Sequence, residues 1–260
     1  MIEKVCIQAK NIVFPLLSLA ILLVGFGCSD TKPKYEKPLI DLLIQQYRPY
    51  EDFSIILYDM DYDEGSKNYR HQYQVLYTSI SSTDTLINDS ITGWYNVDEM
   101  YFNKHIDNMG MEIAFKKDGK IEKKAAPPGY GNYVGNERYG RWQTDGSGRS
   151  FWVFYGQYRL LSDLFRMGRY PYYRSSYNEY YSGYYSTGRP YYGSASGGGY
   201  RYGTNSEYTK SSRPNSKWNE RPTSFKRDVR NRVKRSSQRT RSNSRYKGSS
   251  SRSRSGRAGK

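Results

Sequence analysis

The residues best suited to chemistry begin with a short acidic stretch. Asp59, Asp61 and Asp63 alternate along the chain, and Glu64 follows directly. Oxygen ligands at alternate positions are how a calcium-binding loop starts, but that loop needs Gly at its sixth position and an acidic residue at its twelfth. Those positions hold Glu64 and Arg70. The stretch therefore favours a strand end and a solvated turn over a calcium site.

Acid–base and nucleophilic chemistry find little support elsewhere in the chain. His71 and His105 are isolated histidines without the spacing of a metal-binding or catalytic pair. Asp61 and Glu112 could act as acid and base only if the fold brought them together. A phosphate-binding loop, a Gly-x-Ser-x-Gly elbow and any cysteine after Cys28 are missing from the sequence. We therefore expect a protein that is not an enzyme, with no catalytic residue, metal or cofactor.

The N-terminus has the pattern of a secretory signal peptide. Lys4 and Lys10 precede an apolar run over residues 12–26, which ends at small residues beside Cys28. The run has about 15 residues, whereas a membrane-spanning helix needs roughly 20. An uncleaved N-terminal anchor with an incidental cysteine is the alternative interpretation.

The residues Gly25, Phe26, Gly27 and Cys28 resemble the lipobox of bacterial lipoprotein precursors, although Gly25 stands where Leu is common. The resemblance implies removal of residues 1–27, a diacylglycerol on the Cys28 thiol and a tether over residues 28–37. It also implies a cell-envelope protein held in the membrane by its lipid. Ser29, at the position that sorts lipoproteins, favours the outer membrane over the inner one.

Residues 38–126 are expected to form a small α+β domain. An antiparallel sheet with helices on one face is the simplest packing for its elements. Asp98 and Glu99 suit the start of a helix, and Trp94 beside Tyr95 favours a core position at a strand end. The expected helices span residues 39–47 and 98–106, and the expected strands span residues 53–62, 69–80, 91–97 and 111–124 with a Lys-Asp-Gly turn in the last.

Residues 127–168 combine glycine with a high density of aromatic residues. From Ser150, aromatic residues and leucines recur at helical spacing and predict an amphipathic helix. We expect this helix to dock on the sheet domain; the alternative places Trp142, Trp152 and Tyr155 at a membrane interface or partner surface. The strings APPGY, YVGNERYGRW and FWVFYGQY are similar to those of a group of bacterial secreted or lipid-anchored proteins. That similarity implies a recurring unit and no particular activity.

Residues 169–260 form a basic, low-complexity tail. The chain carries a net charge of +16, and the stretch from Gly129 to its end holds 27 Lys and Arg against 7 Asp and Glu. Few aliphatic residues are present to offset the entropy of ordering, so the composition predicts disorder. Its cations, among them Arg230, Arg232, Lys234 and Arg235, are expected to contact anionic partners.

The signal peptide narrows the choice of anionic partner. An exported lipoprotein meets anionic lipids, lipopolysaccharide and acidic glycans, so a non-enzymatic binding or structural role in the envelope is our first hypothesis. The alternative is a nucleic-acid-binding protein, because Arg interleaved with Tyr also suits phosphates and stacked bases. A tail that only confers solubility is the remaining interpretation. The oligomeric state is not determined by the sequence.

Overall fold

The computed structural model describes residues 39–80, 85–195 and 197–246, with side chains placed as far as Arg239. The chain divides into two compact units, residues 1–37 and 38–260, and the described residues belong to the second. The predicted signal peptide, the lipobox with Cys28 and the tether lie outside the described residues.

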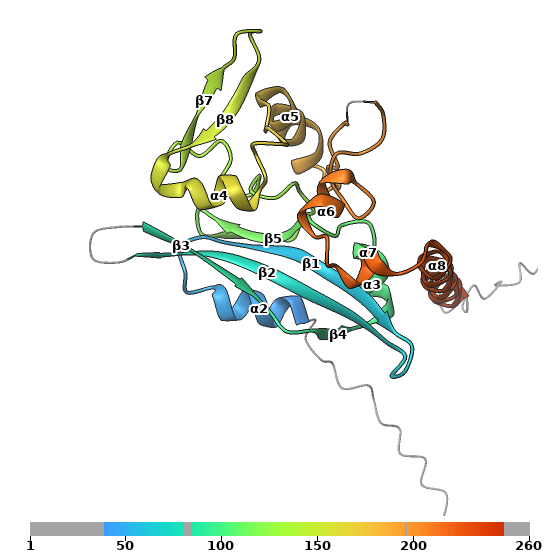
Figure 1. Cartoon of the computed structure of the whole chain (residues 1–260). Helices are drawn as coiled ribbons and strands as arrows, with labels where there is room; N and C mark the ends of the chain where they lie inside the picture. The colour runs from blue at the N-terminus through green and yellow to red at the C-terminus, as the bar shows by residue number, and fades with distance from the viewer. Residues whose placement is uncertain (1–38, 81–84, 196, 247–260) are drawn as a thin grey trace, which may run out of the picture. The chain divides into compact units, whose positions relative to one another are not determined.

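An antiparallel sheet organises the second unit (Figure 1). Its strands run in the order β3-β2-β1-β5-β6, and the short β4 pairs with the start of β2. Hairpins connect β1 to β2, β2 to β3 and β5 to β6, so neighbouring strands are mostly neighbours in sequence. The strands are β1 (Phe53–Asp63), β2 (Asn68–Ile80), β3 (Thr85–Ile91), β4 (Tyr95–Val97), β5 (Glu112–Lys117) and β6 (Lys120–Glu122).

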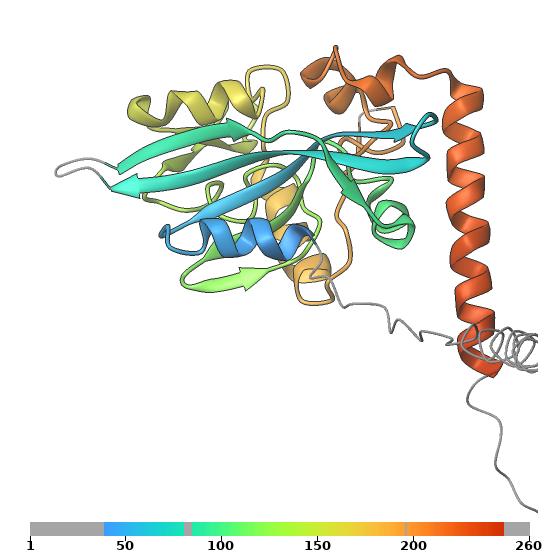
Figure 2. The ribbon, with the colours of Figure 1, turned by 90° about the horizontal axis from the view of Figure 1, so that it is seen from below.

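Two helices cover one face of this sheet, as Figures 1 and 2 show for α2. They are α2 (Leu39–Tyr47) and α3 (Glu99–His105), and the Asp98 side chain caps α3 by accepting from the Tyr101 N–H at 2.8 Å. Their apolar sides meet the sheet in a first core that includes Ile40, Leu43, Phe53, Ile55, Leu57, Val75 and Phe102. The predicted α+β class, with a small antiparallel sheet and these helices on one face, is confirmed.

The segment after residue 126 packs on the opposite face of the sheet, but not as the predicted helix from Ser150. Residues 150–154 form a strand, β8 (Ser150–Phe154), which pairs with β7 (Gly140–Thr144). Trp152 and Phe154 are buried, whereas Phe151 and Val153 are only partly buried, and this alternation has the period of two of a strand. Helical structure begins only after Tyr155, in a 3₁₀ turn (Gly156–Tyr158) and α4 (Arg159–Leu164).

The prediction of disorder from Arg169 onward is wrong as far as Tyr246. Helices α5 (Arg174–Glu179), α6 (Glu207–Ser212), α7 (Lys217–Glu220) and α8 (Thr223–Tyr246), and the π-helical turn η2 (Tyr180–Tyr185), occupy this stretch. The physical reason is tyrosine: its ring supplies buried apolar area that a count of aliphatic residues misses. A second core results, with Ile56 and Leu76 of the sheet and the aromatic residues Tyr130, Tyr133, Tyr139, Trp152, Phe165, Tyr172, Tyr180, Tyr191, Tyr202 and Tyr208. Residues 247–260 lie outside the described part.

A β-bulge in β1 directs two carboxylates toward the C-terminal segment. The register with β2 shifts between Leu57 and Asp59, so Tyr58 has no partner. Side chains alternate along a strand, and one extra residue reverses the alternation. Met60 and Tyr62 therefore face the first core, as Leu57 does, whereas Asp59 and Asp61 point away from it.

Both carboxylates are buried and hold the segment that leads into α8. Asp59 accepts from the Ser216 hydroxyl at 2.6 Å and from the Lys217 N–H at 2.7 Å, at the start of α7. Asp61 accepts from Arg221 at 3.0 and 3.2 Å and from Arg70 at 3.0 Å. Charged hydrogen bonds of this kind are stronger than neutral ones. The two aspartates thereby attach the C-terminal segment to the central strand.

The second core is attached to the sheet by the buried side chain of Glu112 on β5. One carboxylate oxygen accepts from the Gly131 N–H at 2.8 Å. Position 131 must be glycine, because a Cβ there would lie 2.5 Å from the Phe115 ring. Burial raises the pKa of Glu112 from 4.5 to about 7.

Glu112 should make the stability of the fold depend on pH. Its pKa is higher in the folded chain than in the unfolded chain, so its stabilising contribution is complete below about pH 4.5 and is lost as the pH rises through about 7. Between pH 4.5 and 8 the free energy of unfolding of the wild type should fall by about 3 kcal/mol more than that of Glu112→Gln. Chemical denaturation across this range measures the difference. Glu137→Gln, at an exposed glutamate, is the control, and equal losses for wild type and Glu112→Gln would contradict the assignment.

Removing the Asp59 carboxylate should release the C-terminal segment. Asp59→Ala leaves the Ser216 hydroxyl and the Lys217 N–H unpaired, at a cost of about 1–3 kcal/mol, so local opening should become roughly ten- to hundredfold more frequent. Chymotrypsin reports this opening, because Trp218 is buried in the docked state. Asp63→Ala is the matched control, since Asp63 binds Gly65 and Arg70 rather than the C-terminal segment. Equal cleavage rates in both variants would show that Asp59 does not hold the segment.

Candidate anion-binding site

Among the described helices and strands, the long helix α8 carries the largest number of positive charges. It holds nine Lys and Arg residues and a single acidic residue, Asp228. As far as Arg239, where the description of its side chains ends, its apolar residues are Phe225, Val229 and Val233. They are turned inward, four residues apart, on one side of the helix. This narrow stripe packs beside α3, so the cations lie on the remaining surface (Figure 2).

Polar contacts fix α8 at both ends of its interface with α3. Arg230 donates to the Asp107 carboxylate at 2.5 Å and to the Ile106 carbonyl at 3.3 Å, just past the C-terminus of α3. A cation is favourable there because the carbonyl ends of a helix carry partial negative charge. Two turns farther along α8, the Asn103 amide donates to the Ser237 hydroxyl at 2.9 Å. The helix is therefore held as a rigid array of charges.

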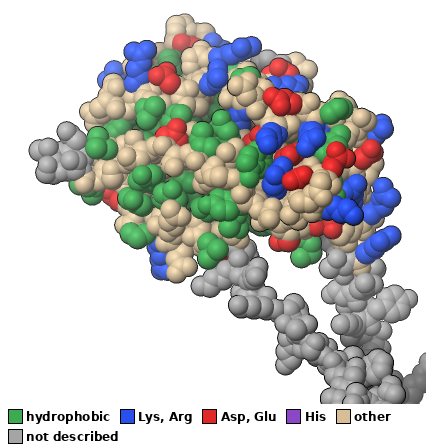
Figure 3. All heavy atoms as spheres, turned by 60° about the horizontal axis from the view of Figure 1, so that its bottom comes forward, with side chains coloured by type: hydrophobic (Ala, Val, Ile, Leu, Met, Phe, Trp, Pro, Cys, Tyr) green, Lys and Arg blue, Asp and Glu red, His purple; other side chains and the backbone are tan. Residues whose placement is uncertain are grey.

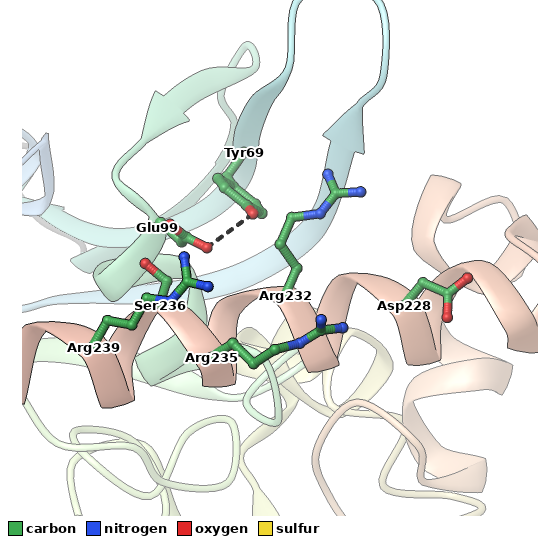
Figure 4. A pocket seen from close by; sticks show the side chains of 7 residues that line it. All are labelled: Tyr69, Glu99, Asp228, Arg232, Arg235, Ser236 and Arg239. Carbon is green, nitrogen blue, oxygen red and sulfur yellow. Dashed lines mark hydrogen bonds between the residues drawn. The ribbon is translucent and has the colours of Figure 1, made fainter.

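A groove of about 670 Å³ lies between α8, the start of α3 and β2. Figure 4 shows Arg232, Arg235 and Arg239 of α8 on one side of it, with Tyr69 and Glu99 on the other. The Tyr69 hydroxyl donates to Glu99 at 3.2 Å. Burial, and then the charge of Glu99, raise the pKa of Tyr69 to about 12, so this hydroxyl stays a donor at neutral pH.

Two arginines of the groove, Arg232 and Arg235, are held in position by contacts that do not neutralise their charge. The Arg232 guanidinium lies 4.7 Å from the Tyr62 ring centre, and the Arg235 Nε donates to the Asn231 carbonyl of its own helix. Neither forms an ion pair with any residue in the described ranges. Guanidinium groups bind phosphate and carboxylate groups in a bidentate manner. The arrangement can therefore bind an anionic group.

The predicted contact cations fall into two classes. Arg232, Lys234 and Arg235 are exposed on α8, whereas Arg230 forms an ion pair with Asp107. In Figure 3, Lys and Arg side chains gather toward the edge where α8 lies, while hydrophobic side chains occupy much of the remaining face. Arg227 is a further exposed cation of α8.

The aromatic residues that the sequence predicted to contact a membrane or a partner lie mostly inside the fold. Trp152 is 1% exposed, so its assignment as a membrane or partner contact is wrong. Its ring is enclosed because it faces Trp142 across the β7–β8 hairpin, at 5.1 Å between ring centres. Trp142 is half-buried beneath Arg174, and of the three only Tyr155 is exposed.

The candidate metal and acid–base residues serve the fold. Asp59 and Asp61 hold the C-terminal segment, and within the described ranges no three His, Cys, Asp or Glu side chains are grouped to bind a metal ion. Burial lowers the pKa of His71 and lowers that of His105 to about 3, as expected of neutral core histidines. Asp61 binds arginines and Glu112 binds Gly131, so the fold does not join them as a pair.

The inward stripe of α8 was detectable in the sequence. Phe225, Val229 and Val233 recur at intervals of four within an Arg- and Ser-rich stretch, which is helical spacing. The composition of the stretch, taken alone, predicts disorder and does not reveal this spacing. The role of Asp59 and Asp61 in holding the C-terminal segment had no signal, because Ser216 and Arg221 lie more than 150 residues from them in the sequence.

No described helix has the length and apolar character needed to cross a membrane. Comparison of the chain with protein-family models, with curated proteins and with solved structures found no match.

Proposed function

We propose that this chain is a lipid-anchored protein of the bacterial cell envelope, with a non-enzymatic role, that binds anionic envelope components through α8. The lipid would be attached at Cys28, and the mature chain would begin there. The outer membrane is the favoured location. Lipid anchoring and an anionic surface belong together, because an anchor with two or more acyl chains would hold the protein stably at the membrane and keep its basic helix beside the anionic headgroups.

One observation carries this proposal: α8 displays Arg227, Arg232, Lys234 and Arg235 on its exposed surface with no acidic partner among the described residues. A basic residue close to an anionic membrane contributes about 1 kcal/mol, and the contribution falls with salt. Because α8 is docked on α3, binding does not require the helix to become ordered first. Phosphorylated headgroups supply the bidentate acceptors that guanidinium groups prefer.

Vesicle binding tests the role of α8 apart from the lipid. The chain beginning at residue 28, with Cys28→Ser, should sediment with phosphatidylcholine vesicles that contain phosphatidylglycerol and not with phosphatidylcholine alone. The double variant Arg232→Gln/Arg235→Gln should bind about thirtyfold more weakly, because it loses about 2 kcal/mol of attraction. The difference between wild type and variant should shrink as salt is raised.

The matched control is Lys120→Gln/Arg141→Gln, which removes the same charge from exposed positions on β6 and β7. An equal loss in both double variants would attribute binding to net charge rather than to α8, and would count against the proposal. Tighter retention of single-stranded RNA than of vesicles would favour the nucleic-acid alternative instead.

A further inference from the structure

The two helices that cover one face of the sheet each expose an apolar side chain on the side away from the sheet. The side of α2 that faces the sheet holds its buried residues, Ile40, Leu43, Ile44 and Tyr47. Leu42 lies on the opposite side of this helix and is 48% exposed. In α3, Phe102 is buried against the sheet, whereas Met100 lies on the opposite side and is 58% exposed. Leu42 and Met100 therefore point away from the same face of the sheet.

Partly exposed tyrosines extend this apolar surface. Tyr50 follows α2 and packs on Tyr77 of β2, with 4.4 Å between the ring centres, and Tyr95 of β4 is partly exposed as well. Figure 3 shows hydrophobic side chains over much of this face. We call the outer side of α2 and α3, with these three tyrosines, the α2–α3 surface. Apolar side chains accompanied by tyrosine are typical of a surface that meets the boundary between a membrane and water.

The charges around this surface favour an anionic partner. Each acidic side chain of α2, of α3 and next to α3 has a partner: Asp41 pairs with Lys123, Asp98 caps α3, Glu99 accepts from Tyr69, and Asp107 pairs with Arg230. Lys104 lies one turn after Met100 on the outer side of α3, is exposed and forms no ion pair with a described residue. The cations of α8 lie beside α3, next to the same surface (Figure 2). An apolar surface with cations along its edge suits a bilayer with anionic headgroups.

The chain enters the described structure at this surface. Ten residues separate Cys28 from Leu39, the first residue of α2. A fully extended stretch of that length spans at most about 36 Å. A lipid at Cys28 would therefore hold α2 within about that distance of the bilayer.

We propose that the α2–α3 surface rests on the lipid bilayer, with Leu42 and Met100 inserted between the headgroups. This docking depends on the proposed lipid at Cys28 and adds an orientation to it, because a tether alone leaves the chain free to turn. Insertion removes apolar side chains from water, and the tyrosines then lie at the level of the headgroups. The tyrosine-rich second core, on the opposite face of the sheet, faces away from the membrane.

A fluorescent label at single positions tests this orientation. The chain from residue 28 with Cys28→Ser contains no other cysteine, so Leu42→Cys or Met100→Cys provides one site for a nitrobenzoxadiazole dye. A histidine tag before residue 28 attaches the chain to vesicles of phosphatidylcholine, phosphatidylglycerol and a nickel-chelating lipid. On these vesicles the emission of the dye at both positions should shift to the blue and should be quenched by a nitroxide-bearing lipid. The shift should persist at high salt, because apolar insertion is not screened.

The matched control is Leu160→Cys on α4, at a leucine that is 46% exposed on the opposite side of the sheet. Its dye should keep the emission that it has in water. A water-like emission at position 42 or 100 on the vesicles, or an equal blue shift at position 160, would overturn the proposed orientation. A blue shift that grows with protein concentration before vesicles are added would show that a second copy covers this surface, and would overturn it too.

The tag separates this test from that of α8, because attachment through nickel requires neither the acylation of Cys28 nor the cations of α8. If the dyes stay in water while untagged chains still sediment through Arg232 and Arg235, only the orientation is wrong. If the dyes insert while Arg232→Gln/Arg235→Gln sediments like the wild type, the orientation stands and the role of α8 is wrong.

Discussion

Two buried carboxylates on the central strand determine how the C-terminal third of this chain is organised. A one-residue bulge at Tyr58 directs Asp59 and Asp61 away from the first core, and both then bind the segment from Ser216 to Arg221. A buried carboxylate without partners would be costly, so each aspartate favours the docked state of the segment that satisfies it. Helix α8 follows directly from Arg221, and its position depends on this attachment.

The tyrosine-rich second core is the counterpart of that attachment. Its rings meet at edge-to-face and tilted angles, as Tyr130 does with Tyr172 at 5.3 Å and 85°. Glycine makes the close approaches between them possible: a Cβ at Gly135 would lie 2.4 Å from the Tyr177 ring. The abundance of tyrosine and glycine therefore reflects a packing solution in this chain rather than low complexity.

Elements with local signals were predictable from the sequence. Asp98 marked the start of α3, and the Lys-Asp-Gly turn marked the β5–β6 hairpin, where Asp118 takes a positive φ of 51°. The residues after Ser150 have apolar side chains that fit both a strand and a helix, and pairing with β7 decided between them. The prediction of a disordered tail was wrong for another reason. Its order depends on contacts between tyrosines far apart in sequence and on Asp59, and composition carries no information about such contacts.

The proposed lipid at Cys28 and the docked α8 would act together at one membrane. That anchor would confine the chain to the surface, where weak contacts from Arg232 and Arg235 would form at a high effective concentration. In the cytoplasm the same cations would instead meet nucleic acid. Under this proposal, the location of the mature chain would decide which anion α8 encounters.

The most direct test of this account is the intact mass and N-terminal peptide of the protein recovered from the membrane fraction, beside Cys28→Ser. The account predicts a chain that begins at an acylated Cys28, and a Cys28→Ser protein that keeps the mass of its unprocessed precursor. An unacylated chain that begins at Met1 and is recovered in the soluble fraction would contradict it.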